Sequence, residues 1–333
     1  MLHSATEFYA LLYQNNEQSD ELESITNQDH EYSLPSFLEI EIKNAIQQLK
    51  STKSPGDDGI TNDILKAIVD PLTPVLTKLF NEILEKKTLP KEWGTAVITL
   101  LYIKGDPTLL ENYRPISLQQ TIYKVFASVL LKRVSRVLDY NQPREQAGFR
   151  RGFSTIDHIF TLTQVIEKYM EYGKTLYLAF VDYSKAFDSI KNKPLWIALK
   201  EQGVESTYVT ILQEIYRNSK AVVKLEQKGE PFQIQRGVKQ GDPISPNLFT
   251  ALLESIFRKL QWESIGININ GEYLNNLRFA DDIVLIAEDH EDLVYMLNTL
   301  DRESQKCGLQ MNKQKTFAMT NGEEITITTE SNK

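Results

Sequence analysis

The fold of this chain is decided by an apolar stretch that two adjacent aspartates interrupt: Leu277-Arg278-Phe279-Ala280-Asp281-Asp282-Ile283-Val284-Leu285-Ile286-Ala287. Its apolar halves predict β-strand, in which most side chains would be buried. Buried carboxylates cost free energy unless something neutralises them, and a divalent cation does so for clustered oxygen ligands. The alternative is a polar β-turn, since Asp tolerates turn geometry. The aspartate pair alone does not decide between a metal site and a turn.

Composition is that of a globular protein and excludes several kinds of site. The 333 residues, 41% hydrophobic and 25% charged, are enough for two or three subdomains. The single cysteine, Cys307, rules out internal disulfides and thiolate zinc sites, and the four histidines lie far apart without metal-ligand spacing. No apolar run is long enough to cross a bilayer, and residues 1–4 do not begin a signal peptide. We therefore expect an intracellular protein of the nucleus or cytoplasm, without a membrane partner.

The distribution of charge matters more than its sum. A net charge of −8 speaks against a nucleic-acid partner at first sight. However, nine acidic residues and no Lys or Arg precede Lys43, whereas basic residues gather at 132–136 and 144–151. A local basic face can bind phosphates even on an acidic chain, so net charge does not exclude nucleic acid.

The order of the predicted elements favours an α+β fold. The acidic lead-in, residues 1–40, is expected to be loosely ordered apart from one short helix at 7–13. Helical periodicity and start signals predict helices at 36–49, 61–69, 72–87, 119–138, 154–170, 195–202, from 245 onward, and at 291–306. Short apolar runs predict strands at 96–102 and 176–181 as well as around the aspartate pair. Neither a βαβ rhythm nor a glycine-rich phosphate loop is present, which disfavours a doubly wound nucleotide-binding fold.

A third aspartate gives the pair a possible partner. Asp182 ends the apolar run 176–181, and strands separated by long insertions can still be neighbours in a sheet. Three carboxylates at one edge would repel one another and raise one another's pKa unless cations were present. Two Mg²⁺ ions would relieve this repulsion, activate a 3′-hydroxyl and stabilise an in-line phosphoryl displacement. The alternative is an unrelated strand-terminal aspartate and a polar turn.

Seven segments, in order, resemble motifs of reverse transcriptases from non-LTR (LINE-like) retrotransposons. The three palm motifs are matched by FVDYSKAFD at 180–188, RGVKQGDPISP at 236–246 and FADD at 279–282. The fingers motifs and their approach are matched by KSPGDDGI at 53–60, NYRPISL at 112–118 and QAGFR at 146–150, and the motif after the catalytic hairpin by GLQMNKQKT at 308–316. One such match would be weak, but seven in family order are specific. The resemblance covers roughly residues 40 to 320 and is nearest to the RTE-like branch.

The resemblance implies a right-hand polymerase. It assigns residues 41–175 to fingers and 176–320 to a palm with an antiparallel sheet, and leaves 321–333 as a truncated end without a thumb. The implied activity is RNA-directed DNA polymerase, which adds dNTPs to the 3′-hydroxyl of a DNA primer on an RNA template. Two Mg²⁺ ions, with Mn²⁺ as a substitute, would be held by Asp182, Asp281 and Asp282.

The resemblance also implies three contacts to the incoming nucleotide and base pair. Phe187 would lie beneath the sugar, where an aromatic ring clashes with a 2′-hydroxyl and selects dNTPs; the alternative is a core phenylalanine. Gln240 and Gly241 would approach the nascent base pair, where glycine permits close contact. The alternative is a strained turn before the helix that begins at Ser245.

Charged residues are implied to hold phosphates. Arg114 and Lys104 would bind the triphosphate, Arg114 by charge-assisted hydrogen bonds, with a surface salt bridge as its alternative. Lys315 would protonate the leaving pyrophosphate, with a solvated lysine as the alternative. Nucleic-acid contacts fall to three residues of the QAGFR region: Gln146, Arg150 and Arg151.

The sequence departs from the family pattern in two ways. Ile103 precedes Lys104 where the family usually has two consecutive basic residues, which puts the efficiency of substrate binding in doubt. The primer grip, the thumb and the upstream endonuclease of these elements are not matched, and we expect them to be lost or supplied by another chain. The alternative function is therefore a catalytically inactive retrotransposon remnant that acts as a nucleic-acid-binding module. An RNA polymerase with the same palm is disfavoured by Phe187.

Overall fold

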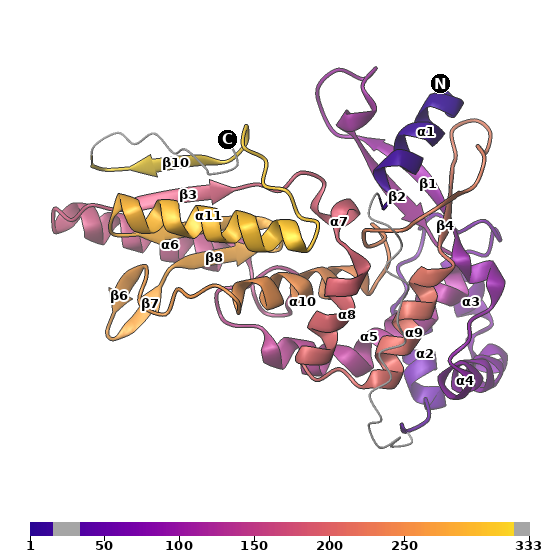
Figure 1. The fold of residues 1–333 in the computed structure, drawn as a ribbon. Helices are drawn as coiled ribbons and strands as arrows, with labels where there is room; N and C mark the ends of the chain where they lie inside the picture. The colour runs from indigo at the N-terminus through magenta and orange to yellow at the C-terminus, as the bar shows by residue number, and fades with distance from the viewer. Residues whose placement is uncertain (16–33, 323–333) are drawn as a thin grey trace. The chain divides into compact units, whose positions relative to one another are not determined.

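Helices and strands alternate irregularly along residues 1–15 and 34–322, the ranges that the computed structural model describes (Figure 1). The chain forms two compact units. The first unit comprises Met1–Leu138 and Leu199–Leu248, and the second comprises Asp139–Ala198 and Phe249–Lys333. Each unit thus joins segments that lie far apart in the sequence, whereas the fingers and palm expected from the motifs are consecutive blocks.

The elements have the following bounds. The α-helices are α1 (Leu2–Leu12), α2 (Glu39–Gln48), α3 (Asn62–Ala67), α4 (Val69–Lys86), α5 (Thr121–Asn141), α6 (Thr155–Glu171), α7 (Ala186–Ser189), α8 (Asn192–Glu201), α9 (Ser206–Arg217), α10 (Ser245–Phe257) and α11 (His290–Lys306). The 3₁₀ helices are η1 (Lys91–Gly94) and η2 (Leu110–Asn112). The strands are β1 (Thr95–Tyr102), β2 (Tyr113–Leu118), β3 (Tyr177–Val181), β4 (Lys220–Val223), β5 (Phe232–Gln233), β6 (Ile267–Ile269), β7 (Glu272–Leu274), β8 (Asn276–Phe279), β9 (Asp282–Ala287) and β10 (Phe317–Thr320).

The first unit is built on a four-stranded sheet of order β2-β1-β4-β5. Strand β1 pairs antiparallel with β2 and parallel with β4, so residues more than 100 apart in sequence become neighbours. An aromatic cluster supports the helices of this unit, because Phe80 of α4 contacts both Trp93 and Phe126 at ring-centroid distances of 6.3 and 5.1 Å. Phe80 and Phe126 are fully buried, which makes this cluster a core of the unit.

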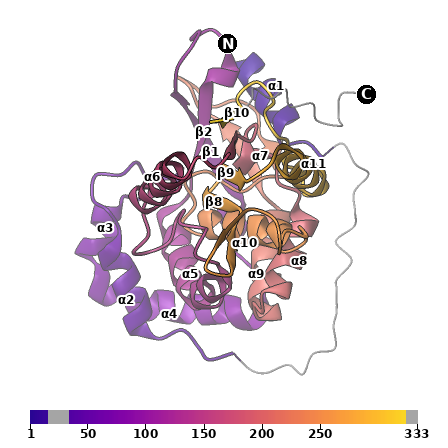
Figure 2. The same cartoon turned by 90° about the vertical axis from the view of Figure 1, so that its left-hand side faces the viewer.

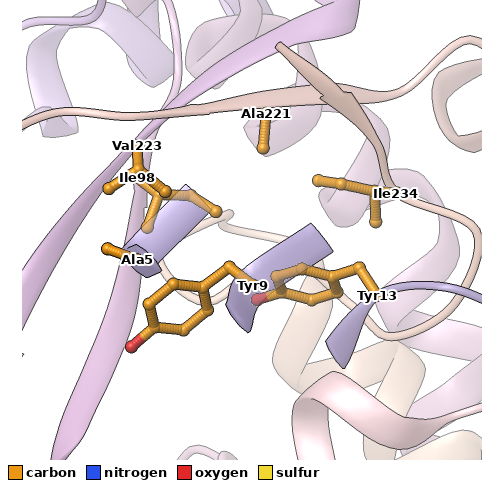
Figure 3. Close-up of a cluster of buried hydrophobic side chains, with 7 residues drawn as sticks. All are labelled: Ala5, Tyr9, Tyr13, Ile98, Ala221, Val223 and Ile234. Carbon is orange, nitrogen blue, oxygen red and sulfur yellow. The ribbon is translucent and has the colours of Figure 1, made fainter. Parts of the chain in front are cut away.

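Helix α1 completes the core of the first unit. Ala5, Tyr9 and Tyr13 follow one another at intervals of four residues and therefore share one face. This face packs on the β1, β4 and β5 region of the sheet (Figure 3), where it contacts Ile98, Ala221, Val223 and Ile234. The predicted short helix at 7–13 is confirmed over 7–12, but α1 already begins at Leu2. The expectation of loose order is therefore wrong for residues 2–6, because the apolar face of the helix has a sheet to cover. Residues 16–33 of that lead-in lie outside the described residues.

The second unit is built on an antiparallel sheet of order β10-β3-β9-β8, which confirms the expected sheet. Helices α6 and α11 lie on opposite faces of it (Figure 2). Val165 of α6 packs with Leu178, Val284 and Ile286 of the sheet. The described helices include none that combines the length and hydropathy needed to cross a membrane.

We expect α1 to contribute to the stability of the first unit. Tyr9 is 1% exposed, so Tyr9→Ala should lower the free energy of unfolding by about 3 kcal/mol through lost burial and a cavity. Leu11 lies on the same helix but is 67% exposed, so Leu11→Ala should change it by less than about 0.5 kcal/mol. Urea unfolding followed by circular dichroism measures both. Equal effects of the two substitutions would contradict the packing of α1.

Candidate active site

The three predicted aspartates lie at one end of the second-unit sheet. Strands β8 and β9 form a hairpin in which Phe279 pairs with Asp282, so that Ala280 and Asp281 are its two turn residues. Val181 of β3 pairs with Ile283 of β9. The next register position therefore places Asp182 opposite Asp282, where Cα atoms of paired strands are about 5 Å apart. The two interpretations of the aspartate pair, a turn and an acidic site, describe the same hairpin.

The hairpin turn is strained at Ala280. Its φ of +57° lies in the left-handed region, which residues with a Cβ rarely adopt. The Gln146 side chain holds this conformation, because its Oε1 accepts hydrogen bonds from the backbone N–H of Ala280 (3.1 Å) and of Gly148 (2.7 Å). An otherwise unfavourable turn is thereby fixed next to Asp281.

A backbone segment, residues 145–149, runs beside β8, and we call it the strap. The Arg278 N–H donates to the Glu145 oxygen (2.7 Å), and the Ala147 N–H donates to the Arg278 oxygen (2.9 Å). A Cβ added at Gly148 would lie 2.2 Å from the Ala280 nitrogen. Only glycine therefore allows the strap to approach the aspartate turn this closely.

A buried ion pair anchors β8 behind the turn. Arg278 is 2% exposed and its Nη2 lies 3.1 Å from Glu254 Oε2, while its guanidinium carbon lies 4.0 Å from the centre of the Phe257 ring. Burial lowers the pKa of the Arg278 guanidinium. Removing Glu254 would leave the buried charge of Arg278 without this partner, whereas Glu254 also pairs with Arg258 at 2.9 Å. Sequence reasoning missed this pair, although a charged residue within the apolar stretch 277–287 was a signal for it.

Lys315 lies beside the carboxylate of Asp182. Its Nζ is 3.5 Å from Asp182 Oδ2, and the Asn312 N–H donates to the Asp182 backbone oxygen (2.7 Å). The segment that follows α11 therefore lies beside the end of β3 and places Lys315 next to Asp182. With a side chain 62% exposed, Lys315 remains accessible to a ligand, and the ion pair itself adds little stability.

Phe187 is part of an aromatic row. It lies in α7, directly after the loop that follows Asp182, and is half-buried. Its ring stacks on that of Phe249 at 4.6 Å with an interplanar angle of 6°, and Phe149 contacts it edge-on at 6.1 Å and 81°. The half-exposed ring fits the predicted contact to a sugar better than a position fully within the core.

The carboxylates suit a metal in chemistry and in backbone position. Their oxygens are the ligands that Mg²⁺ prefers. Asp182 Oδ2 is a buried oxygen that accepts no hydrogen bond from the described residues, and its ion pair with Lys315 Nζ is 3.5 Å long. Within residues 1–15 and 34–322, no three His, Cys, Asp or Glu side chains are grouped closely enough to hold a metal ion. The register thus brings the three residues to one sheet end, and binding requires their side chains to turn toward one another.

The remaining nucleotide-contact candidates belong to the first unit. Lys104 follows β1 and Arg114 lies on β2, and both are exposed. Gln240 accepts a hydrogen bond at its backbone oxygen from the Ser117 N–H (2.8 Å). Gly241 has a φ of +104°, and an added Cβ would lie 3.0 Å from the Ser117 oxygen, so this position requires glycine.

A buried charge cluster underlies Gln240 and Gly241. Lys239 is 2% exposed, and its Nζ lies 5.7 and 5.5 Å from the ring centres of Tyr123 and Tyr216. Asp242, also 2% exposed, accepts a hydrogen bond from the Tyr123 hydroxyl. Burial lowers the pKa of Lys239 to about 8 and raises that of Asp242, each effect being opposed by the charge of the other residue. The sequence placed Lys239 in a motif but did not show that it is buried.

The nucleic-acid candidates of the strap region differ in accessibility. Gln146 is 0% exposed and its side chain is used by the turn, so in this structure it is not accessible for the predicted nucleic-acid contact. The Arg150 guanidinium donates to the Gln146 backbone oxygen (2.9 Å) and lies 4.1 Å from the centre of the Phe153 ring. Arg151 is exposed and remains the most accessible of the three.

Comparison with known proteins identifies relatives of this arrangement. Residues 103–329 match the family model described as reverse transcriptase (RNA-dependent DNA polymerase). The chain is 30% identical over 270 residues to the Pol polyprotein of the retrotransposable element R2DM from Drosophila melanogaster, covering 80% of this chain and 25% of that protein. It is 29% identical over 322 residues to the R2 polyprotein of Nasonia vitripennis, covering 90% and 30%.

Solved structures agree with these relatives in fold. Apo telomerase from Candida tropicalis, truncated from its C-terminal domain, superposes with a TM-score of 0.54 at 16% identity, covering 80% of this chain and 57% of that one. A second apo telomerase structure from the same organism gives a TM-score of 0.52 at 16% identity, covering 76% and 50%. The fold is therefore the right-hand polymerase fold. The chain spans less than a third of the length of the two R2 polyproteins.

The Lys239 cluster predicts a pH dependence of stability. The pKa of Lys239 is about 8 in the folded chain and 10.5 ordinarily, so between these values the unfolded chain binds more protons and stability rises with pH. Between pH 8 and pH 10 the parent should gain about 1 to 3 kcal/mol relative to Lys239→Met. Urea unfolding across this range measures the gain. Lys78 is exposed, so Lys78→Met should show the same increase in the free energy of unfolding with pH as the parent. If Lys239→Met also showed this increase, the lowered pKa would not belong to Lys239.

Proposed function

This chain belongs to the reverse transcriptase (RNA-dependent DNA polymerase) family, and we propose that it is the polymerase domain of a non-LTR retrotransposon, of the RTE-like branch. The proposed reaction adds dNTPs to a DNA primer on an RNA template. The observation that carries this proposal is the register that sets Asp182 opposite Asp282 beside a turn containing Asp281. The relatives support it, since they include R2 polyproteins and an RNA-directed DNA polymerase from the mobile element jockey of Drosophila melanogaster.

We assign the palm to residues 176–320 and the fingers to 41–175. The antiparallel sheet β10-β3-β9-β8 supports the palm assignment because it carries all three aspartates. Residues 1–40 would precede the fingers, with α1 packed on the sheet of the first unit, and 321–333 would follow the palm. In the assigned fingers, exposed Lys104 and Arg114 are available for a triphosphate, and Arg151 for template phosphates.

The three aspartates would hold divalent metal ions, which reverse transcriptases as a family use. When bound, two Mg²⁺ ions, or Mn²⁺ in their place, would supply neutralisation of the carboxylates and phosphates and would make the primer hydroxyl more acidic. Asp182, Asp281 and Asp282 are suited to this by their oxygen ligands and by their common sheet end. The strained turn at Ala280 presents Asp281 and Asp282 from adjacent positions.

The residues around the aspartates would act on the phosphates and the sugar. The primer 3′-oxygen forms the new P–O bond to the α-phosphorus, and the bond to the pyrophosphate oxygen breaks. Lys315, 3.5 Å from Asp182, would protonate that pyrophosphate as it leaves. Phe187, half-buried on Phe249, would block the space of a 2′-hydroxyl. In the first unit, Gln240 and Gly241 would contact the nascent base pair, because glycine at position 241 leaves the backbone accessible.

A catalytically inactive remnant that binds nucleic acid is the second candidate. Ile103 favours the inactive remnant, because this residue is 46% exposed at a position where the family usually has a basic side chain. The carboxylates favour the polymerase, since a binding module has no need of three acidic groups at one sheet end beside a phosphate chain. The two candidates differ in a measurable way, because only the polymerase extends a primer.

The polymerase proposal predicts primer extension that depends on the aspartates. The full chain with Mg²⁺ should extend a DNA primer on an RNA template, and Asp281→Asn/Asp282→Asn should reduce the rate by at least about 100-fold. Asp70→Asn is the matched control, because Asp70 is an exposed aspartate of α4 that pairs with Lys43, and it should extend at the parental rate. Equal extension by parent and double variant, or none by either, would overturn the proposal for this chain.

The sugar contact predicts a change in nucleotide preference. Phe187→Ala should raise the efficiency of rNTP relative to dNTP incorporation by about tenfold or more, since the space of the ring becomes free for a 2′-hydroxyl. Single-nucleotide extension with each nucleotide measures this ratio. Phe160→Ala, a substitution at a residue of α6 that is 65% exposed, should leave it unchanged. A parental ratio in Phe187→Ala would remove the role of this ring.

A further inference from the structure

Phe149 has a backbone conformation that its own side chain disfavours. Its φ is +60°, in the left-handed region where a bulky aromatic residue is a clear outlier. The side chain is also 49% exposed, so burial of the ring does not account for the choice of phenylalanine. Glycine would adopt this conformation without steric cost. Strain of this kind persists where the surroundings impose it, and it points to a function for the residue.

The neighbours of Phe149 are held tightly. Before it, the Gly148 N–H donates to Gln146 Oε1 (2.7 Å), and the Gly148 backbone lies against Ala280. After it, the Arg150 guanidinium donates to the Gln146 backbone oxygen (2.9 Å) and stacks on Phe153. The chain is therefore held both before and after Phe149, which fixes the backbone position from which the Phe149 side chain projects.

The ring of Phe149 borders the ring of Phe187. Phe249, which is 0% exposed, supports one face of Phe187 at a centroid distance of 4.6 Å. Phe149 meets Phe187 edge-on at 6.1 Å and 81°. Phe187 can move out of its position only by turning about its side-chain bonds, and these two neighbours limit that turn on two sides. All three rings belong to the second unit.

We propose that Phe149 is a specificity-determining residue, which keeps Phe187 in the position that excludes a nucleotide 2′-hydroxyl. Gln146 and Gly148 hold Phe149 in place and so connect the sugar contact to the aspartate turn through a single short segment. This inference rests on the proposed function, because it requires a nucleotide sugar at Phe187. The left-handed conformation at residue 149 is then needed to direct an aromatic ring, held by the strap, toward Phe187.

The test is Phe149→Gly in the full chain. Glycine relieves the left-handed strain, so the fold should be kept, while Phe187 gains freedom to turn away. The ratio of dNTP to rNTP incorporation, as kcat/KM, should fall by about two- to tenfold, the range expected for losing one edge-on aromatic contact. Phe187→Ala should lower the ratio further. Lys87→Gly is the matched control, since Lys87 ends α4 with a φ of +54° and should leave the ratio unchanged.

A second measurement reports on the ring without catalysis. With 4-fluorophenylalanine at position 187, the ¹⁹F spectrum should show one environment in the parent and a shifted or exchange-broadened signal in Phe149→Gly. Lys87→Gly should retain the parental spectrum. An unchanged spectrum in Phe149→Gly would overturn the proposal, because Phe149 would then not confine Phe187.

The outcomes separate this inference from the function on which it rests. If Phe187→Ala changes the sugar preference and Phe149→Gly does not, the role of Phe149 is refuted while the polymerase stands. A lower Tm of Phe149→Gly with a parental sugar preference would likewise refute it, since Phe149 would then serve packing alone. If parent and Asp281→Asn/Asp282→Asn extend equally, the polymerase proposal fails and the assignment of Phe149 fails with it.

Discussion

Two hydrogen bonds accepted by one buried amide oxygen hold the candidate site of the second unit together. Gln146 Oε1 receives the N–H groups of Gly148 and Ala280, which belong to segments more than 130 residues apart. Because both donors are buried, losing the acceptor would leave two unsatisfied polar groups in the interior. The same oxygen stabilises the left-handed conformation of Ala280 and holds the backbone of Gly148, the residue before Phe149. The aspartate turn and the aromatic row therefore depend on one side chain.

Each unit also buries charge next to residues proposed to contact the nucleotide. In the second unit the Arg278–Glu254 pair underlies the strand that leads to the aspartates. In the first unit Lys239 and Asp242 flank Gln240 and Gly241, with Tyr123 bound to Asp242. Buried pairs add little net stability, but breaking one is costly, so they restrict the chain to one arrangement. The aspartate turn and the segment containing Gln240 and Gly241 therefore each lie next to buried charged groups, and removing a partner of these groups would be costly.

Particular residues show how far the sequence predicts this protein. The helices near 154–170 and 291–306 are confirmed as α6 and α11, because long amphipathic periods and capping residues are local signals. The sequence predicts only a short helix at 7–13 in the N-terminal segment, whereas α1 begins at Leu2, because its apolar face is covered once β1 and β4 lie beside it. The nucleic-acid contact predicted for Gln146 follows from its motif, and the motif gives no local sign that this side chain is buried.

By itself, the sequence determined which residues are candidates for the chemistry and which family the chain resembles. Short motifs specify these candidates by residue type and spacing: Asp182, Asp281, Asp282 and Phe187. Such motifs can be recognised in the sequence without knowledge of the structure. Only the tertiary structure decided that Asp182 lies opposite Asp282. The same holds for the hydrogen bond from the Ala280 N–H to Gln146 and for the contact between the rings of Phe149 and Phe187. These relations depend on strand register and on burial, which arise when distant segments pair and exclude water, and neither quantity is encoded in any local stretch of residues.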